Sequence, residues 1–325
     1  MRKVIFTFIF GVLGLSLLHA QQDPQFSMYM FNGQYINPAY VGSRGVLDMT
    51  GLYRYQWAGQ NFEGSPQSMS IGLNTPFKKE QYAIGVYTGY DHIGFVDMYN
   101  LMGQFAYRIN VKKSKISLGV QAGFYHYNNN KTSHTLFDPN DEIFAEENVL
   151  FTPNIGAGIH VYSDRYFVGA SFPHLLNMNL SQKLQYAATN SDVNRQYRHF
   201  FATAGVVIGK ETSTVKFKPT ILLKYVQGLD KKIPDFDLNA NFLFVDRFWL
   251  GAGVRTGGNR VGPYFSDIVG MFECLVTQQL RIGYSYDYVL SDLSNYTHGS
   301  HEIMLGYSFG YQKKKFVNVR YGTYF

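Results

Sequence analysis

The sequence lacks the features that most enzymes, disulfide-bonded secreted proteins and helical membrane proteins carry. Its single cysteine, Cys274, excludes an internal disulfide. After residue 20, no apolar run approaches the length of about eighteen residues that a transmembrane helix needs. There is no CxxC pair and no P-loop, and charged residues make up only 16% of the chain. These absences count against a redox protein, a P-loop nucleotide-binding protein and a helical membrane protein.

The first twenty residues predict a Sec-type secretory signal. Arg2 and Lys3 precede an apolar stretch of about fifteen residues, shorter than the roughly twenty that a spanning helix needs. We expect cleavage between Ala20 and Gln21. Since residue 21 is not cysteine, lipoprotein processing is not expected. Loss of the two cations lowers the net charge from +6 to +4, too mild an excess to indicate a nucleic-acid partner.

Aromatic residues and alternating segments are abundant instead. The chain holds 26 tyrosines and 27 phenylalanines. From residue 46 onward, apolar and polar side chains alternate in segments that turn-forming residues separate. In 280–290, for example, Ile282 and Tyr284 share one face, whereas Asp287 lies on the other. An exported chain with this pattern is predicted to be all-β, a transmembrane antiparallel up-and-down β-barrel with an irregular N-terminal segment.

About fourteen strands are predicted, an even number as in single-chain bacterial barrels. Their expected ranges are 46–57, 67–75, 82–90, 98–109, 115–127, 152–162, 166–173, 198–209, 215–227, 236–244, 248–255, 267–276, 280–290 and 301–309. Connections after even strands are short and those after odd strands generally longer, as for periplasmic turns and outer loops. A soluble β-sandwich gives no reason for this asymmetry. Pro219 cannot donate to a ladder and suggests a bulge or a later start of 215–227.

The polar face of the strands is expected to line the lumen, because a charge facing lipid at mid-membrane costs roughly 2–4 kcal/mol. The apolar face is then expected to contact outer-membrane lipid. The charged and amide residues that we place in the lumen are Arg54, Gln56, Gln104, Arg108, Gln121, Lys216, Lys224, Asn239, Asn241, Arg255 and Asp287.

Residues 21–45 form a segment that is too aromatic for a linker and lacks the period of a strand or helix. Its key aromatic, amide and proline residues are Phe26, Tyr29, Phe31, Tyr35, Asn37 and Pro38. Fully extended, the segment reaches about 80 Å, at roughly 3.3 Å per residue. We expect it to pack in or against the periplasmic mouth, narrowing the barrel and presenting a docking surface. The alternative is a leader remnant with no fixed position.

Charge is divided between the two predicted sides of the membrane. The outer loops are acidic, mostly within 128–151. The periplasmic turns and the tail form a predicted basic rim of Lys78, Lys79, Lys112, Lys113, Lys115, Lys313, Lys314, Lys315 and Arg320. Such a rim suits anionic lipid headgroups, and it equally suits a periplasmic partner protein.

Three motifs resemble catalytic or ligand-binding motifs, and each has a simpler structural explanation. THGSHE (297–302) lies at a strand junction, where adjacent side chains point to opposite faces and cannot converge. GAGVRTGG (251–258) has its third glycine one place late for a dinucleotide fingerprint, and no helix follows. DPNDEIFAEE (138–147) offers oxygen ligands, but Ile143 stands where an EF-hand has glycine. We expect no enzyme, catalytic residue or cofactor and assign no metal ligands, and cation binding by 128–151 stays open.

Five blocks give the chain a more specific resemblance. They are QQDPQFSMYMFNGQYINPAYVGSRG (21–45), YRYQWAGQNFEGSPQSMSIGLNTPF (53–77), PNIGAGIHVYSDRYFVGASFPHLLN (153–177), LNANFLFVDRFWLGAGVRTGG (238–258) and SHEIMLGYSF (300–309). Together they resemble the PorP/SprF family of type IX secretion system outer-membrane proteins along nearly the whole mature chain. The resemblance implies an outer-membrane barrel that serves protein secretion, with the type IX machinery and a secreted cargo, such as a large adhesin, as partners. It also implies a role in gliding motility or adhesin anchoring.

The expected organisation is a signal peptide (1–20), an N-terminal periplasmic or lumen segment (21–45), the barrel (46–309) and a basic periplasmic tail (310–325). A general diffusion porin is the alternative function, because fourteen strands leave a lumen wider than side chains alone fill in an eight-stranded barrel. An outer-membrane hydrolase is disfavoured, since no catalytic triad is visible.

Gel migration and cysteine labelling test the barrel and its topology. Unheated and heated samples are expected to migrate differently in detergent gels, because a closed barrel resists unfolding. Cysteines introduced into 128–151 are expected to react with an impermeant label on intact cells. Labelling that requires rupture of the outer membrane would invert the topology.

Overall fold

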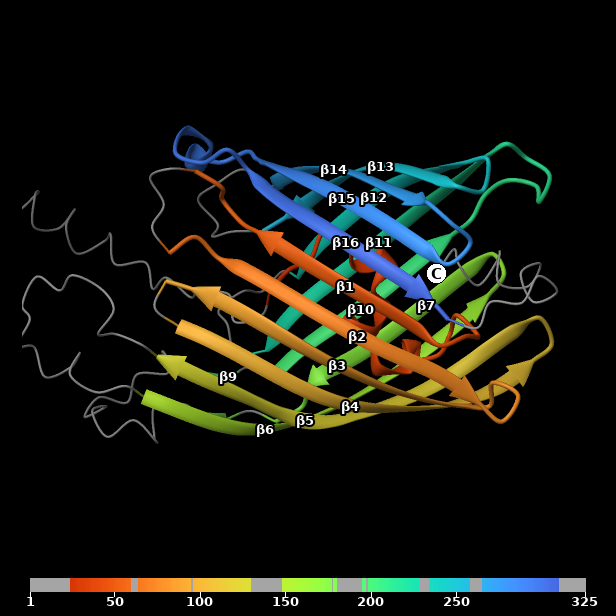
Figure 1. The fold of residues 1–325 in the computed structure, drawn as a ribbon, viewed down its shortest axis with the longest axis horizontal. Coiled ribbons are helices and arrows are strands. Elements are labelled where there is room, and N and C mark those ends of the chain that lie inside the picture. The colour runs from red at the N-terminus through yellow and green to blue at the C-terminus, as the bar shows by residue number, and fades with distance from the viewer. Residues whose placement is uncertain are drawn as a thin grey trace, which may run out of the picture.

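A closed antiparallel barrel of fourteen strands forms the body of the protein (Figure 1). The computed structural model describes residues 24–309 apart from 60–63, 95, 130–147, 177, 180–194, 197, 228–233 and 258–264. The barrel strands are β1 (Asp48–Tyr55), β2 (Gln67–Phe77), β3 (Tyr82–Ile93), β4 (Val96–Val111), β5 (Ser114–Asn129), β6 (Asn148–Ser163), β7 (Tyr166–His174), β10 (Arg198–Val206), β11 (Val215–Gln227), β12 (Asp235–Phe244), β13 (Phe248–Thr256), β14 (Phe265–Leu275), β15 (Leu280–Val289) and β16 (Ser300–Ser308). The predicted fold class and all fourteen strands are confirmed.

Two further strands, β8 (Met178–Asn179) and β9 (Arg195–Gln196), pair with each other in a separate two-stranded sheet. They lie between β7 and β10, in a stretch predicted as a loop. The helices are equally short: η1 (Tyr29–Phe31), α2 (Gly33–Ile36), η2 (Pro38–Tyr40) and η6 (Asp292–Asn295). Within the described ranges, none of the helices is long and apolar enough to cross a membrane.

The two ends of the barrel differ in their connections. We call the end where β1 begins and β16 ends the turn side, and the opposite end the loop side. On the turn side, two residues join β4 to β5 and two join β6 to β7. One loop-side connection is shorter than expected, because β3 and β4 pair up to Ile93 and Val96. Strands β4, β5 and β6 have sixteen residues each, and they extend beyond their neighbours on the loop side (Figure 1).

Apolar side chains cover the outside of the barrel. Val120, Leu250 and Leu305 are each more than half exposed, whereas Asp287 and Glu302 on the inside are fully buried. A water-soluble protein shows the opposite distribution, so this pattern indicates an outer surface in contact with lipid. Aromatic pairs mark both ends of the apolar belt, with Phe77 stacked on Tyr82 near the turn side and Phe124 on Phe151 near the loop side.

The predicted lumen-facing residues do face inward. Ten of the eleven are buried, and Gln56, just beyond the end of β1, is half-buried. The prediction for Pro219 was wrong. β11 pairs with β12 in one register from Val215 to Lys224, with no bulge and no later start. Pro219 has no backbone N–H to donate, and the edge of β11 that faces β10 is affected instead. Pairing with β10 ends at Thr220 and resumes only as an isolated bridge at Phe217.

The largest cluster of buried apolar side chains lies inside the barrel. Met28, Met30 and Ile36 from the N-terminal segment join inward residues of the wall, such as Trp249 and Met304. Figure 1 shows the short helices of this segment enclosed by the strands. Around this segment, the interior of the barrel is therefore packed as a protein core.

Replacing Val120 by arginine tests the lipid-facing assignment. Val120 lies outside on β5 and is 55% exposed, so the charge is expected to destabilise the folded barrel by roughly 2–4 kcal/mol. The measurement is the free energy of unfolding in lipid vesicles. Val215→Arg, at the turn-side end of β11, is the matched control, with an expected cost of about 0–1 kcal/mol. Equal costs at both positions would contradict the assignment.

Candidate functional site: the filled lumen

The candidate functional site is the lumen together with the N-terminal segment, residues 24–47, that occupies it. The segment forms three consecutive helical turns, η1, α2 and η2, and its residues 26–32 are all buried. Asn37 starts η2, since its Oδ1 accepts the backbone N–H of Ala39 at 2.9 Å and Pro38 follows at the first helical position. Gly42 and Gly45, at φ of +70° and +75°, then turn the chain towards β1.

A buried ionic network holds the start of the segment on the loop side. The carboxylate of Glu302 accepts the backbone N–H groups of Ser27 and Met28 at 2.8 and 2.9 Å. The Ser27 hydroxyl donates to Asp287 at 2.7 Å and accepts from Arg54 at 2.9 Å. All these side chains are buried, so each hydrogen bond to a charged group contributes about 1.5–3 kcal/mol.

An arginine and a lysine extend this loop-side network around the wall. Arg255 donates to the Ser27 hydroxyl at 2.8 Å and lies 3.3 Å from Asp287. Lys224 lies 2.8 Å from Asp237 and donates to Gln25 at 2.9 Å. The network contains three cations, Arg54, Lys224 and Arg255, and three carboxylates, Asp237, Asp287 and Glu302. Equal numbers of opposite charges allow burial that isolated charges would not.

Amide side chains hold the middle of the segment to the opposite wall. Gln34 donates to the carbonyl of Val86 at 3.1 Å and accepts from Asn74 at 2.8 Å. Asn37 donates to the carbonyl of Ile159 at 2.9 Å. These bonds reach strands β2, β3 and β6, so the segment is fastened on several sides of the lumen.

A second ionic cluster lies on the turn side, where the segment leaves the lumen. Asp48, the first residue of β1, lies 3.5 Å from Arg44 and 2.9 Å from Arg281, and accepts from Ser308 at 2.7 Å. Nearby, the ammonium group of Lys218 lies over the rings of Phe31, Phe167 and Trp249 at 5.3–5.9 Å. Cation–π contacts of this kind are favoured where water is excluded.

Two inward glycines allow the segment to approach the wall. A Cβ at Gly119 would lie 2.2 Å from the backbone nitrogen of Ala39, and one at Gly158 would lie 2.1 Å from Asn37 Oδ1. At both positions a side chain would take the place of the segment. The wall and the segment therefore fit each other at the level of single atoms.

The structure places the predicted segment residues in this interface. Phe26, Tyr29, Phe31, Asn37 and Pro38 are buried, and Tyr35 is half-buried with edge contacts to Phe26 and Tyr87. The segment reaches further than the expected periplasmic mouth, because Gln25 and Ser27 contact residues in the loop-side half of the barrel. Its described start, Pro24, accepts a hydrogen bond from Tyr35 at 3.2 Å.

Only part of the predicted basic rim lies within the described residues. Lys78, Lys79, Lys112 and Lys113 are exposed in turn-side connections, whereas Lys115 is half-buried and lies 2.7 Å from Glu80. Residues Ala20, Gln21, Lys313, Lys314, Lys315 and Arg320 lie outside the described residues, as does the acidic stretch 138–147. Across the part of the chain that is described, no group of histidine, cysteine and carboxylate side chains is arranged to hold a metal ion.

Sequence reasoning missed several residues of the interface. Leu52, Trp249 and Met304 face inward and pack against the segment. Ser27 and Glu302 form its strongest polar anchor. The apolar residues carried a usable signal, because Leu52 interrupts the polar face between Thr50 and Arg54.

A closed barrel with an apolar exterior and a polar, occupied interior defines a transmembrane β-barrel protein of the outer-membrane type. A family model described as type IX secretion system membrane protein PorP/SprF matches residues 18–307. The chain belongs to this family. Its members are components of the type IX secretion system, so the family and the fold together place the chain at the outer membrane.

Other comparisons add little to this assignment. No curated protein matches the chain. Among solved structures, the outer-membrane protein Omp33 of Acinetobacter baumannii aligns with a TM-score of 0.47 and 8% identity, over 81% of this chain and 98% of that chain. A mutant of the Rh. blastica porin aligns with a TM-score of 0.37 and 9% identity, over 81% of this chain and 99% of that chain. These likenesses are too weak to carry an argument about function.

Gly119→Val tests the fit between wall and segment. The new side chain would collide with the backbone at Ala39, so residues 33–44 are expected to leave their position and exchange amide hydrogens faster. Gly103→Val is the matched control, since a Cβ there meets nothing closer than the Ala122 carbonyl at 3.7 Å. The measurement is hydrogen exchange by mass spectrometry in detergent. Equal protection of 33–44 in both variants would show that the contact does not hold the segment.

Proposed function

We propose that this chain is a non-enzymatic, closed component of the type IX secretion system that supports export or surface anchoring of cargo proteins such as adhesins. Family membership supports the secretion role. The proposal that the barrel is closed is supported by the N-terminal segment, which is hydrogen-bonded to strands on several sides of the lumen. In this proposal, cargo does not pass through the barrel, and the protein acts through its outer surfaces.

The packing of the lumen argues against the alternative function, a general diffusion porin. A cavity beside the segment, lined by Tyr29, Asn37, His160 and Thr203 among others, has a volume of about 30 Å³. That is room for about one water molecule. A porin needs a continuous water-filled path, and the segment occupies the space where that path would run.

The proposed docking surfaces lie at the ends of the barrel. The exposed lysines of the turn side suit an acidic periplasmic component of the machinery, and they equally suit anionic lipid headgroups. We place the turn side in the periplasm, because short periplasmic turns and longer outer loops are typical of such barrels. The described start of the N-terminal segment then lies in the outer half of the lumen.

The proposed domain organisation follows the sequence. A signal peptide, residues 1–20, directs Sec-type export and is cleaved between Ala20 and Gln21. Residues 21–45 form the N-terminal periplasmic or lumen segment, 46–309 form the barrel, and 310–325 form a basic periplasmic tail.

Deleting residues 21–42 while keeping the signal tests this function. The barrel is expected to stay heat-modifiable, because its fourteen strands are untouched. Single-channel conductance is expected to rise, because the lumen is emptied, and cargo display on the cell surface is expected to fall. Deletion of 138–147, in a predicted outer loop, is the control for conductance and is expected to leave it unchanged.

The two readouts separate the parts of the proposal. Higher conductance with normal cargo display would retain the closed lumen and reject a role of the segment in docking. A steady open pore in the unaltered protein would favour the porin. Unchanged conductance and normal display after the deletion would reject both roles of the segment.

A further inference from the structure

A furrow crosses the lipid-facing surface of four adjacent strands. Its floor is a row of small residues that pair with one another in register across β11, β12, β13 and β14: Pro219, Ala240, Ala252 and Gly270. All four lie on the outer face, where none is buried. A row of small side chains leaves the sheet backbone accessible along this line.

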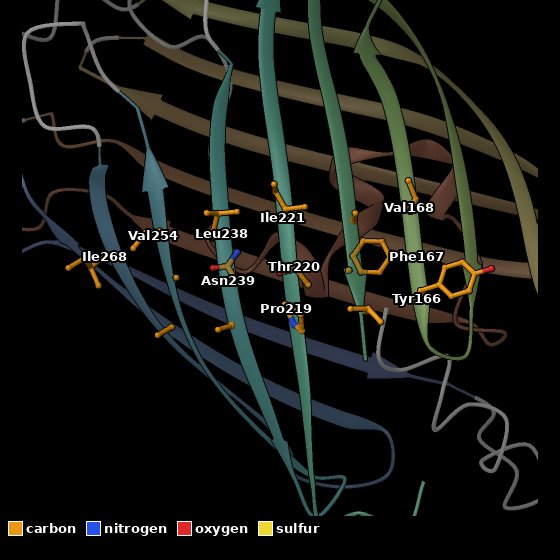
Figure 2. A pocket seen from close by; sticks show the side chains of 16 residues that line it. Tyr166, Phe167, Val168, Pro219, Thr220, Ile221, Leu238, Asn239, Val254 and Ile268 are labelled. Atoms are coloured by element: carbon orange, nitrogen blue, oxygen red, sulfur yellow. The ribbon is translucent and has the colours of Figure 1, made fainter. Parts of the chain in front are cut away.

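Rows of large apolar side chains lie on both sides of this row of small residues, and the loop-side row lines the furrow. Two residues nearer the turn side, the row is Phe217, Phe242, Leu250 and Phe272. Two residues nearer the loop side, it is Ile221, Leu238, Val254 and Ile268. Figure 2 shows the side chains of this second row on four neighbouring strands. The two rows stand four residues apart along each strand, or about 13 Å at 3.3–3.4 Å per residue.

The furrow is large and mostly apolar. Its volume is about 740 Å³. On one side its lining reaches Ile268 of β14. On the other it continues past Val206 of β10 to Tyr166 and Val168 of β7. The nearby polar side chains, Thr220 and Asn239, are buried on the lumen side, so the furrow presents mainly apolar side chains to an occupant, with the exposed Tyr166 at its β7 end.

We propose that this furrow is a binding site for the acyl chain of a membrane glycerophospholipid. The site lies in the apolar belt, where hydrocarbon is the surrounding medium, and an empty space of this size would forfeit van der Waals contact along its whole lining. The small floor residues allow a chain to approach the backbone, as small residues do at packing surfaces in membranes.

The direction of the furrow favours an acyl chain, and not a transmembrane helix of a partner protein, as its occupant. Strands of such barrels tilt by about 35–45° from the membrane normal, so a row perpendicular to them is inclined by about 45–55°. Transmembrane helices tilt by about 0–40°, and a straight helix would cross the furrow instead of following it. A flexible hydrocarbon chain can follow it.

The position of the furrow along the strands indicates which leaflet of the membrane supplies the bound lipid. The floor residues lie four or five positions from the turn-side end of their strands, for example Ala252 from Phe248 and Gly270 from Leu275. At about 3.3 Å per residue along a tilted strand, this is within the turn-side half of the hydrocarbon core, which is about 30 Å thick. The bound chain therefore comes from a lipid of the turn-side leaflet.

Photo-crosslinking tests the site with the full barrel. The purified protein is reconstituted in phosphatidylethanolamine vesicles that contain a phospholipid with a diazirine on its acyl chain, and crosslinked peptides are mapped by mass spectrometry. We expect crosslinks concentrated on β11–β14. In Ala240→Phe/Ala252→Phe, which fills the floor, they are expected to fall to the level of the rest of the belt.

Ala122→Phe is the matched control, because Ala122 is also a lipid-facing alanine but lies on β5. It is expected to leave the crosslinks on β11–β14 unchanged. Heat-modifiability checks that each variant folds, and Ala252→Leu alone replaces the double variant if that one does not. The vesicles contain no other protein. Crosslinks on β11–β14 in them would therefore show that phospholipid alone fills the furrow, without the lipid anchor of a partner protein. Even crosslinking around the belt, or an unchanged pattern after filling, would overturn the proposal.

Discussion

The carboxylate of Glu302 is the group on which the rest of the interior depends. It is fully buried on β16, and it receives two backbone N–H groups from the N-terminal segment and the guanidinium of Arg54 from β1. A buried carboxylate without such partners costs several kcal/mol. In the filled lumen the segment therefore supplies partners that this buried carboxylate needs, and the carboxylate in turn helps to fix the position of the segment.

Both ionic clusters also include residues at the seam where the sheet closes. Arg54 and Glu302 are direct cross-strand partners between β1 and β16, as are Asp48 and Ser308. Arg281 on β15 reaches across β16 to Asp48. The segment that precedes β1 in the chain thus contributes Ser27 to one end of the seam and Arg44 to the other. Filling the lumen and closing the barrel are in this respect one set of interactions.

The sequence predicted the strands of the barrel wall better than the contacts of the segment that fills the lumen. Period-two alternation assigns each side chain to one of two faces, which was enough for the fourteen strands and for the lumen positions of residues such as Arg108 and Asn241. It does not say what lies opposite an inward side chain. Trp249 and Met304 were therefore not recognised as packing partners of the segment, although the excess of aromatic residues in 21–45 indicated that it would be packed. The path of the segment to the loop side depends on contacts between residues more than 270 positions apart, such as Ser27 with Glu302, which no local pattern encodes.

Because the interior is occupied, the surfaces available to other molecules are the outer ones, and the strand lengths show that these are unequal. Sixteen residues at about 3.3 Å per residue, tilted by about 40°, rise about 40 Å, whereas the apolar band of such barrels is about 25 Å tall. Strands β4, β5 and β6 therefore carry their pairing well past the membrane on the loop side, while β1, with eight residues, does not. The inner face of this taller wall bears Met98 and Tyr125, both buried, and the Tyr125 hydroxyl lies 3.1 Å from His174 of β7. A rigid wall on one side of the outer mouth, a basic rim on the opposite side of the membrane and a furrow in the belt between them give the closed barrel three distinct exterior surfaces, and the proposed roles in docking and lipid binding require no passage through its centre.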